Sequence, residues 1–344
     1  METLGQRGPS TTVVGLLALL VLLAVLTLAA CGGSDATTAP SPSVEPSPVA
    51  ASPSVAASPS AIPLPAPTVA GTIAFSKVSP TESDDADIFV VRADGTHLKQ
   101  LTDSPKWEEH PSWSPDGKRI VYEVGSNSYP REDPSVWVMN ADGSGKARLT
   151  KGWEPHWSPD GQRIVFTRFL GPPKYDVILV MNADGSDVRL VTQRQLGQLN
   201  PSWTPDGRRV LFTDGWDDGC AVNLDGSGRV TLAQTNNKLL KDIAASPDGK
   251  SYAYPSSQDA AVYVARLSGK GAPVAVLERL SDYLAAGNGD VTVAWTPDGK
   301  ALSVANSTGE GTVGSPIVVF KADGSGLSAV PGIDAAIDPA WRPE

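Results

Sequence analysis

The sequence predicts an all-β protein folded as a six-bladed β-propeller, and two observations lead to this prediction. The 344 residues include 33 Gly and 30 Pro, as is typical of a chain with many tight turns. A Trp-Ser/Thr-Pro-Asp-Gly motif also occurs four times, with one Ala-Ser-Pro-Asp-Gly copy and a truncated Trp-Arg-Pro copy at the end. The prolines of these six copies are separated by 44, 46, 42, 50 and 46 residues: Pro115, Pro159, Pro205, Pro247, Pro297 and Pro343. Periods in the forties with strand-like content indicate the blades of a propeller.

The first thirty residues have the features of a secretory signal. An apolar run, Val13–Ala30, is interrupted only by Gly15 and Thr27, and it ends in Leu-Ala-Ala ahead of Cys31. This ending resembles the bacterial lipobox, in which the cysteine sulfur is acylated. We therefore expect residues 1–30 to be a lipoprotein signal peptide and Cys31 to be the lipidation site. An uncleaved membrane anchor and an ordinary signal peptide remain the alternatives.

Residues 31–69 are predicted to be the lipidated cysteine followed by a disordered linker rich in Pro, Ser and Ala. Nine prolines lie between Pro40 and Pro67, and only Asp35 and Glu45 are charged. Such a stretch has no hydrophobic periodicity and favours an extended, partly polyproline II conformation. We expect it to hold the propeller, residues 70–344, away from the membrane.

Each repeat contains four predicted strands. A short first strand ends in the Trp, and the Ser/Thr-Pro-Asp-Gly turn leads into a β-branched second strand such as Arg119–Tyr122. An apolar third strand such as Val136–Met139 ends in an Asp-Gly turn, which is a strong hairpin signal. The fourth strand ends in Leu-Thr, as at Leu149-Thr150. The Trp is expected to pack between blades, with Ala245 replacing it once, and the Asp of each turn is expected to be structural.

The two ends of the predicted propeller complement each other. Gly71–Phe75 matches a second strand, whereas Asp338–Trp341 matches a first strand. The C-terminal strand is therefore expected to complete the N-terminal blade and to close the ring, which removes its open edges.

The motifs Trp-Ser-Pro-Asp-Gly-Lys, Val-Met-Asn-Ala-Asp-Gly-Ser and Leu-Thr together resemble the TolB-type, WD40-like propeller repeat of bacterial envelope proteins. The resemblance runs from about residue 71 to the end, and it implies the propeller fold. TolB proteins carry an additional α/β domain ahead of the propeller, and here the proline-rich linker occupies that place. The resemblance therefore does not imply the role of TolB itself.

One polar position recurs three residues before each repeated Trp or its Ala replacement. Aligned in this way, the position holds His110, Glu154, Asn200, Asp242, Thr292 and Asp338. If first strands line a central channel, these residues converge at one mouth, where propellers usually bind ligands. Glu108, Glu109 and Asp290 add negative charge, so Ca²⁺ or a basic peptide would suit this mouth. The alternative is a water-filled channel with a solvated polar lining.

Composition excludes some functions. The formal net charge of −10 gives no electrostatic footprint for nucleic acid. With Cys31 assigned to lipid, Cys220 has no partner for an internal disulfide and is expected to be a small core residue. Neither a Gly-x-Ser-x-Gly elbow nor a spaced histidine triad is present, so no catalytic residue and no dedicated metal site are predicted. The acidic run Glu82–Asp87 and the pair Asp217-Asp218 are interpreted as loop charges.

These observations favour a non-catalytic, monomeric lipoprotein on the outer face of the cytoplasmic membrane or in the cell envelope. Its propeller would bind or scaffold an envelope protein, a peptide or a glycan, and it would touch the membrane only through the lipid anchor. No cofactor is expected unless Ca²⁺ occupies the channel mouth. The alternative is an extracytoplasmic carbohydrate-active lyase or glycosidase, with carboxylates such as Glu154 and Asp338 in catalytic roles.

Overall fold

A computed structural model describes the following residue ranges: 64–78, 85–126, 133–171, 176–192, 197–214, 218–233, 242–256, 260–268, 272–284, 290–307 and 315–344. The predicted signal peptide, Cys31 and most of the predicted linker lie outside these ranges. Within them, no helix is both long enough and apolar enough to span a membrane. The fold is an all-β propeller, as predicted.

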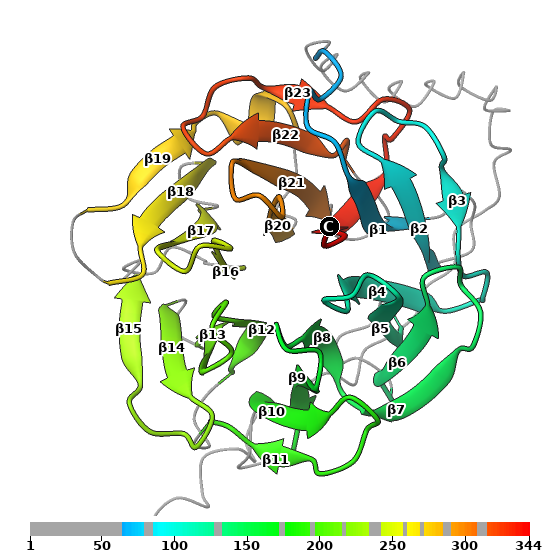
Figure 1. Ribbon diagram of the computed structural model, residues 1–344, viewed down its shortest axis with the longest axis vertical. Coiled ribbons are helices and arrows are strands. Elements are labelled where there is room, and N and C mark those ends of the chain that lie inside the picture. Colours follow the sequence, from blue (N-terminus) through cyan, green and yellow to red (C-terminus); the bar gives the residue numbers. More distant parts are fainter. Residues whose placement is uncertain are drawn as a thin grey trace, which may run out of the picture. The chain divides into compact units, whose positions relative to one another are not determined.

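The strands form five antiparallel groups around a common centre (Figure 1). Four groups are separate four-stranded sheets. They are β8 (Trp153–Trp157), β9 (Arg163–Phe169), β10 (Asp176–Asn182) and β11 (Arg189–Leu190); β12 (Leu199–Trp203), β13 (Arg209–Thr213), β14 (Gly219–Asn223) and β15 (Val230–Ala233); β16 (Ala244–Ala245), β17 (Ser251–Ser256), β18 (Ala261–Arg266) and β19 (Val274–Leu277); and β20 (Asp290–Trp295), β21 (Ala301–Ser307), β22 (Val318–Lys321) and β23 (Ser328–Ala329).

The fifth group is one eight-stranded sheet. Its strands are β24 (Ala336–Trp341), β1 (Thr72–Val78), β2 (Ala86–Arg92), β3 (Lys99–Gln100), β4 (Trp107–Trp113), β5 (Arg119–Gly125), β6 (Ser135–Asn140) and β7 (Ala147–Lys151). Its two halves are joined by a single parallel residue pair, Ala86 with Trp107. Hydrogen bonding therefore gives four separate blades and one double-sized sheet, where the sequence predicted six equal sheets.

The C-terminal strand β24 pairs antiparallel with the N-terminal strand β1, with Ala74 opposite Ala340 and Ser76 opposite Ile337. Strand β1 in turn pairs with β2 along its whole length. One strand of this half-sheet thus comes from the far end of the sequence.

The repeated Ser/Thr-Pro-Asp-Gly segments form self-contained turns. In the first, the Ser114 hydroxyl donates to Asp116 Oδ1 over 2.6 Å, and the Lys118 amide donates to the same oxygen over 3.1 Å. Gly117 completes the turn with a φ of 63°, which glycine adopts without steric cost. The turn aspartates are therefore structural, as predicted.

The repeated tryptophans connect neighbouring repeats. Trp113 Nε1 donates to the Ala340 carbonyl, Trp203 Nε1 to the His156 carbonyl, and Trp295 Nε1 to the Ala244 carbonyl, over 3.1 to 3.2 Å. In each case the acceptor is the residue just before the repeated Trp, or before its replacement Ala245, in a neighbouring repeat. Arg163 stacks over the Trp203 ring at 5.2 Å. Both contacts place the tryptophans between blades, as expected.

Ala245 leaves room where the other repeats have a tryptophan, and tyrosines fill it. Tyr252, only 1% exposed, lies opposite Ala245, and its hydroxyl donates to the Leu232 carbonyl. Tyr254 stacks on Tyr252 and on Tyr263 with centroid distances of 5.9 and 5.4 Å. This blade is therefore packed by its second and third strands.

Candidate functional site

Four of the six predicted site residues share one unusual backbone conformation. His110, Glu154, Asn200 and Asp338 each have a φ of 52°, and each precedes a proline. Their strands β4, β8, β12 and β24 shift register at this point. A bulge re-aims a side chain and interrupts the ladder, so the recurring polar position is a built feature of the innermost strands.

The other two predicted residues differ. Thr292 pairs in regular register with Ala305 in β20, and its Oγ1 is buried without a hydrogen-bond partner among the described residues. Asp242 lies just before β16 and has no proline after it. Neither has a positive φ among the described residues.

Carboxylates of one repeat accept backbone amides of the next. The Asn200 amide donates to Glu154 Oε2 over 2.8 Å, and the Val293 amide donates to Asp242 Oδ2 over 2.9 Å. The His110 amide reaches Asp338 Oδ2 over a longer 3.4 Å. Each bond satisfies an amide that the ladder leaves without a partner. These side chains therefore connect adjacent repeats around the inner strands.

Glu123 belongs to this group, although the sequence analysis did not include it. It lies in β5, is fully buried, and its Oε2 accepts the Glu154 amide over 3.3 Å. The residue aligned with it in β9 is Thr167, whose hydroxyl donates to Glu154. A glutamate within the apolar run Ile120–Val124 is the signal that could have identified it.

His110 is surrounded by three carboxylates. Its Nδ1 lies 3.1 Å from Glu123 Oε2 and 3.5 Å from Glu109 Oε2, and its Nε2 lies 3.7 Å from Asp338 Oδ2. Burial opposes protonation, but Asp338, Glu123 and Glu109 together raise the pKa of His110 well above its ordinary value. With an acceptor facing each ring nitrogen, the surroundings of His110 favour its protonated form.

Burial favours the neutral form of two nearby groups. Burial, followed by repulsion from His110, lowers the pKa of His156 to about 4, so this imidazole is neutral at pH 7. Burial raises the pKa of Asp242 to about 7, although the amides of Val293 and Ile243 oppose this shift. The inner strands thus contain one fixed cation among several carboxyl groups.

Glu109, His110 and Glu123 each offer a ligand atom, and the three atoms lie within 4.8 Å of one another. A metal ion would need the neutral imidazole as ligand. Because the same carboxylates stabilise the imidazolium, the arrangement favours the proton at this position.

The remaining site predictions fall elsewhere. Cys220 is a free, fully buried cysteine in β14, and burial raises the pKa of its thiol, which makes it inert.

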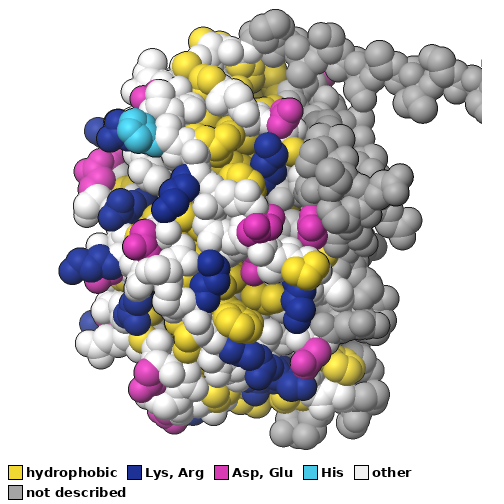
Figure 2. Space-filling view, turned by 90° about the vertical axis from the view of Figure 1, so that its right-hand side faces the viewer, with side chains coloured by type: hydrophobic (Ala, Val, Ile, Leu, Met, Phe, Trp, Pro, Cys, Tyr) yellow, Lys and Arg dark blue, Asp and Glu magenta, His cyan; other side chains and the backbone are white. Residues whose placement is uncertain are grey.

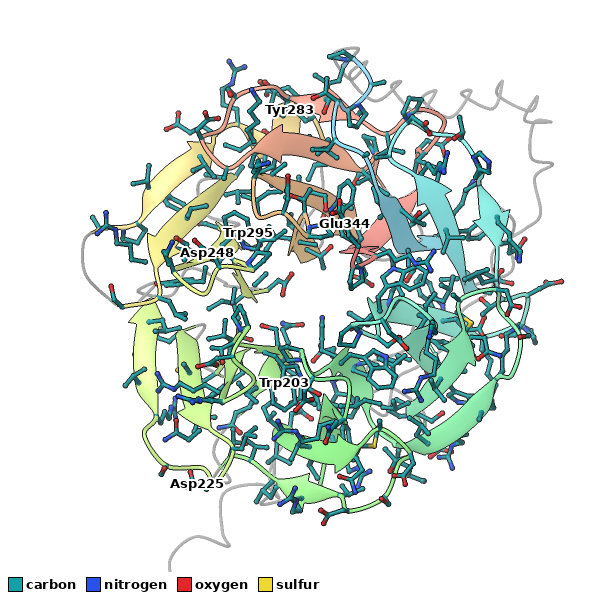
Figure 3. All side chains as sticks on the ribbon, in the orientation of Figure 1. Trp203, Asp225, Asp248, Tyr283, Trp295 and Glu344 are labelled. Carbon is teal, nitrogen blue, oxygen red and sulfur yellow. The ribbon has the colours of Figure 1, made fainter. Side chains whose placement is uncertain are left out.

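In Figure 3, Asp225 lies at the outer rim, whereas the turn residue Asp248 lies nearer the centre. Asp87, interpreted from sequence as a loop charge, instead lies in β2, so that interpretation is wrong.

Comparison with known protein families identifies the repeat. The TolB β-propeller domain model matches residues 72–239. Residues 72–239 are therefore similar to a TolB β-propeller domain. No match was found among the curated proteins compared with it.

Solved structures agree with this fold. TolB from Acinetobacter baumannii superposes with a TM-score of 0.64 at 21% identity, over 80% of this chain and 67% of that chain. A putative TolB from Agrobacterium tumefaciens gives 0.56 at 15% identity, over 78% and 90%. A chain of a nidogen/laminin complex gives 0.59 at 16% identity, over 79% and 98%. At these identities the likeness concerns the fold alone.

One side of the propeller is seen in Figure 2, where basic and acidic side chains are interspersed. A broad basic stripe of the kind that tracks a phosphate backbone does not run across it. The concentrated charge of the described residues lies instead on the inner strands.

Proposed function

We propose that this chain is a non-catalytic cell-envelope lipoprotein whose TolB propeller binds a protein or peptide through a cationic segment. The observation that carries the proposal is the group of carboxylates around His110 on the inner strands. Glu109 and Asp338 keep about 10% of their side chains exposed, so their field reaches solvent. Fixed negative charge of this kind steers and selects cationic partners.

The proposed ring has six blades closed by β24. In this interpretation the eight-stranded sheet is two four-stranded blades, because among the described residues a single β-ladder pair, Ala86 with Trp107, joins its halves. Six inner strands then carry the six aligned positions, from His110 to Asp338. Closure brings Asp338 of the last repeat against His110 of the second strand group.

Binding rather than catalysis is favoured by how the carboxylates are used. Glu154 accepts both the Asn200 amide and the Thr167 hydroxyl, and Asp242 accepts two amides. A carboxylate held in this way, as Glu154 is, keeps its charge, whereas a general acid must gain and lose a proton during turnover. A glycan partner, and the alternative of a glycan-active enzyme, are tested by adding polyuronate to the assay below.

The experiment titrates the full-length protein with a fluorescent lysine-rich peptide at low and physiological salt. We expect binding that weakens with salt, and Glu109→Gln is expected to weaken it about tenfold, since it removes one of the closest charges. The matched control is Asp142→Asn, which removes the same charge from an exposed turn and should leave affinity unchanged.

Equal loss in both variants would mean that the peptide responds only to net charge, and the proposal would fail. Cleavage of polyuronate that disappears in Glu154→Gln would instead establish the enzymatic alternative.

A further inference from the structure

The contact between the two halves of the eight-stranded sheet has its own chemistry. Strand β2 begins at Ala86, whose amide lies 3.5 Å from the Lys106 carbonyl at the start of β4. The residues that follow on each strand are Asp87 and Glu108. Two acidic side chains therefore lie where the first and second strand groups meet.

This acidic pair breaks the repeat pattern. The Ile88 amide donates to the Thr102 hydroxyl, and the Ile178 amide donates to the Thr192 hydroxyl in the same way. The two isoleucines are therefore equivalent, and so are the residues just before them, Asp87 and Val177. At the next two junctions the equivalent pairs are Ser135 with Gly152 and Val177 with Gln198. A feature that blade packing required would recur, and this one does not.

Asp87 is already held in place by its own half-sheet. Its Oδ2 accepts the Gln100 amide nitrogen over 2.9 Å. Its Oδ1 receives longer contacts of 3.3 Å from the Thr102 hydroxyl and the Ser104 amide. The carboxylate is thus oriented by donors on β3 and the segment that follows it.

Glu108 faces this oriented carboxylate from β4. It is only 4% exposed, and it lies near Asp87, Thr102 and Ser104. The hydroxyls of Thr102 and Ser104 and the carboxyl of Asp87 all interact with the Glu108 carboxyl, but its buried Oε2 has no partner in hydrogen-bond geometry among the described residues. A buried carboxylate oxygen left without such a partner is costly, so this oxygen beside a second carboxylate is a position where a cation could be coordinated.

The charges lead to the same conclusion. Burial, with a contribution from Asp87, raises the pKa of Glu108 to about 7, and burial likewise raises the pKa of Asp87. Near neutral pH the pair therefore carries negative charge that neighbouring hydroxyls and amides only partly compensate.

We propose that Asp87 and Glu108, with the hydroxyl of Ser104, form a binding site for a hard divalent cation of the calcium class. The donors are all oxygens, with no imidazole or thiolate, which selects Ca²⁺ over zinc-like ions. The cation would tie β2 to β4 beside the parallel residue pair Ala86–Trp107. The site is separate from the Glu109–His110–Glu123 group, and it does not depend on the proposed function.

Calorimetric titration of the full-length protein, stripped with chelator, measures Ca²⁺ binding directly. We expect one site per chain at pH 7.5, with a dissociation constant on the order of 10⁻⁴ M, as in extracellular modules. Because a proton on Glu108 competes with the cation, affinity is expected to fall about tenfold or more at pH 5.5.

Three variants assign the site. Glu108→Gln should abolish the heat of binding and the accompanying rise in Tm, whereas Asp225→Asn, an exposed turn variant, should retain both. Glu109→Gln should also retain both. If Glu109→Gln rather than Glu108→Gln removes binding, the cation belongs to the His110 group, and the proposal is overturned.

A second measurement needs no variant at Glu108. Terbium should bind the wild-type protein with emission sensitised through the adjacent Trp107, and Ca²⁺ should displace it. Absence of both calorimetric and terbium binding, with a Tm that only falls as pH rises, would identify a shared proton instead and would refute the site.

Discussion

His110 and His156 lie on neighbouring inner strands and are expected to hold opposite protonation states. Acceptors face both ring nitrogens of His110, whereas His156 Nδ1 is buried without a partner among the described residues. The difference follows from the carboxylates around one ring and the apolar burial of the other.

Proton-detected NMR of the histidine rings tests this assignment, with the exposed His97 as the third signal. His110 should stay protonated through pH 7.5, and His156 should stay neutral down to about pH 4. Because folding raises the pKa of His110, this residue stabilises the fold at pH values below its pKa in the unfolded state. The stabilisation is lost as pH rises through its pKa in the folded state. Because folding lowers the pKa of His156, the fold loses stability as pH falls from the pKa of this histidine in the unfolded state towards 4. A neutral His110 at pH 7 would contradict the account.

Gly152 sits at a close approach of two strands. Its φ is 139°, and a Cβ there would lie 2.6 Å from the Phe166 ring and from the Thr167 carbonyl. Gly152→Ala should destabilise the protein by about 2–4 kcal/mol through strain and overlap. Chemical denaturation measures this, with Gly171→Ala as control, since Gly171 has a φ of 78° with nothing within 4 Å. Equal losses of stability in the two variants would show that backbone strain at a positive φ, and not the overlap with Phe166 and Thr167, causes the effect.

At the level of the strands, the repeat predicted much of what is observed. The Trp position and the Ser-Pro-Asp-Gly turn are local signals, so their roles could be predicted from spacing. The bulge at His110 could not, because a proline after a polar residue is compatible with several conformations. The pairing of Asp87 with Glu108 depends on the contact between two strand groups, and because the two acidic residues do not recur at the equivalent junctions, no repeat alignment reveals it.

The tryptophan contacts between repeats should dominate the packing energy. Trp203 is 7% exposed, stacks under Arg163 and donates to the His156 carbonyl. Trp203→Ala is expected to lower the free energy of unfolding by about 3–5 kcal/mol. Trp203→Phe, which keeps most of the ring volume but loses the donor, should cost clearly less. Denaturant titration distinguishes the two, and a negligible effect of Trp203→Ala would contradict the role in packing.

At the level of the whole molecule, the membrane anchor remains a prediction, because Cys31 lies outside the described residues. Cys31→Ala should release the protein from the membrane fraction or leave it unprocessed, because acylation of the sulfur provides the attachment. Fractionation with mass determination of the processed form checks this. Membrane attachment that persists through an uncleaved segment would disprove lipidation.

The pairing of β24 with β1 matters for the proposed function. His110 meets Asp338 only because β24 returns to β1. The sequence could indicate the pairing of β24 with β1 from its complementary ends, since a lone second strand and a lone first strand match one blade. It could not indicate that this pairing brings His110 among its carboxylates.

The most direct test of closure uses the double variant Ala74→Cys with Ala340→Cys, because these two residues are opposite each other in β1 and β24. Mild oxidation followed by non-reducing mass analysis should reveal a complete disulfide and a raised Tm. The control, Ala74→Cys with Ala329→Cys, places the second thiol in β23, which pairs with β22 instead, and should not crosslink. A folded first variant that forms no disulfide would contradict the closed ring.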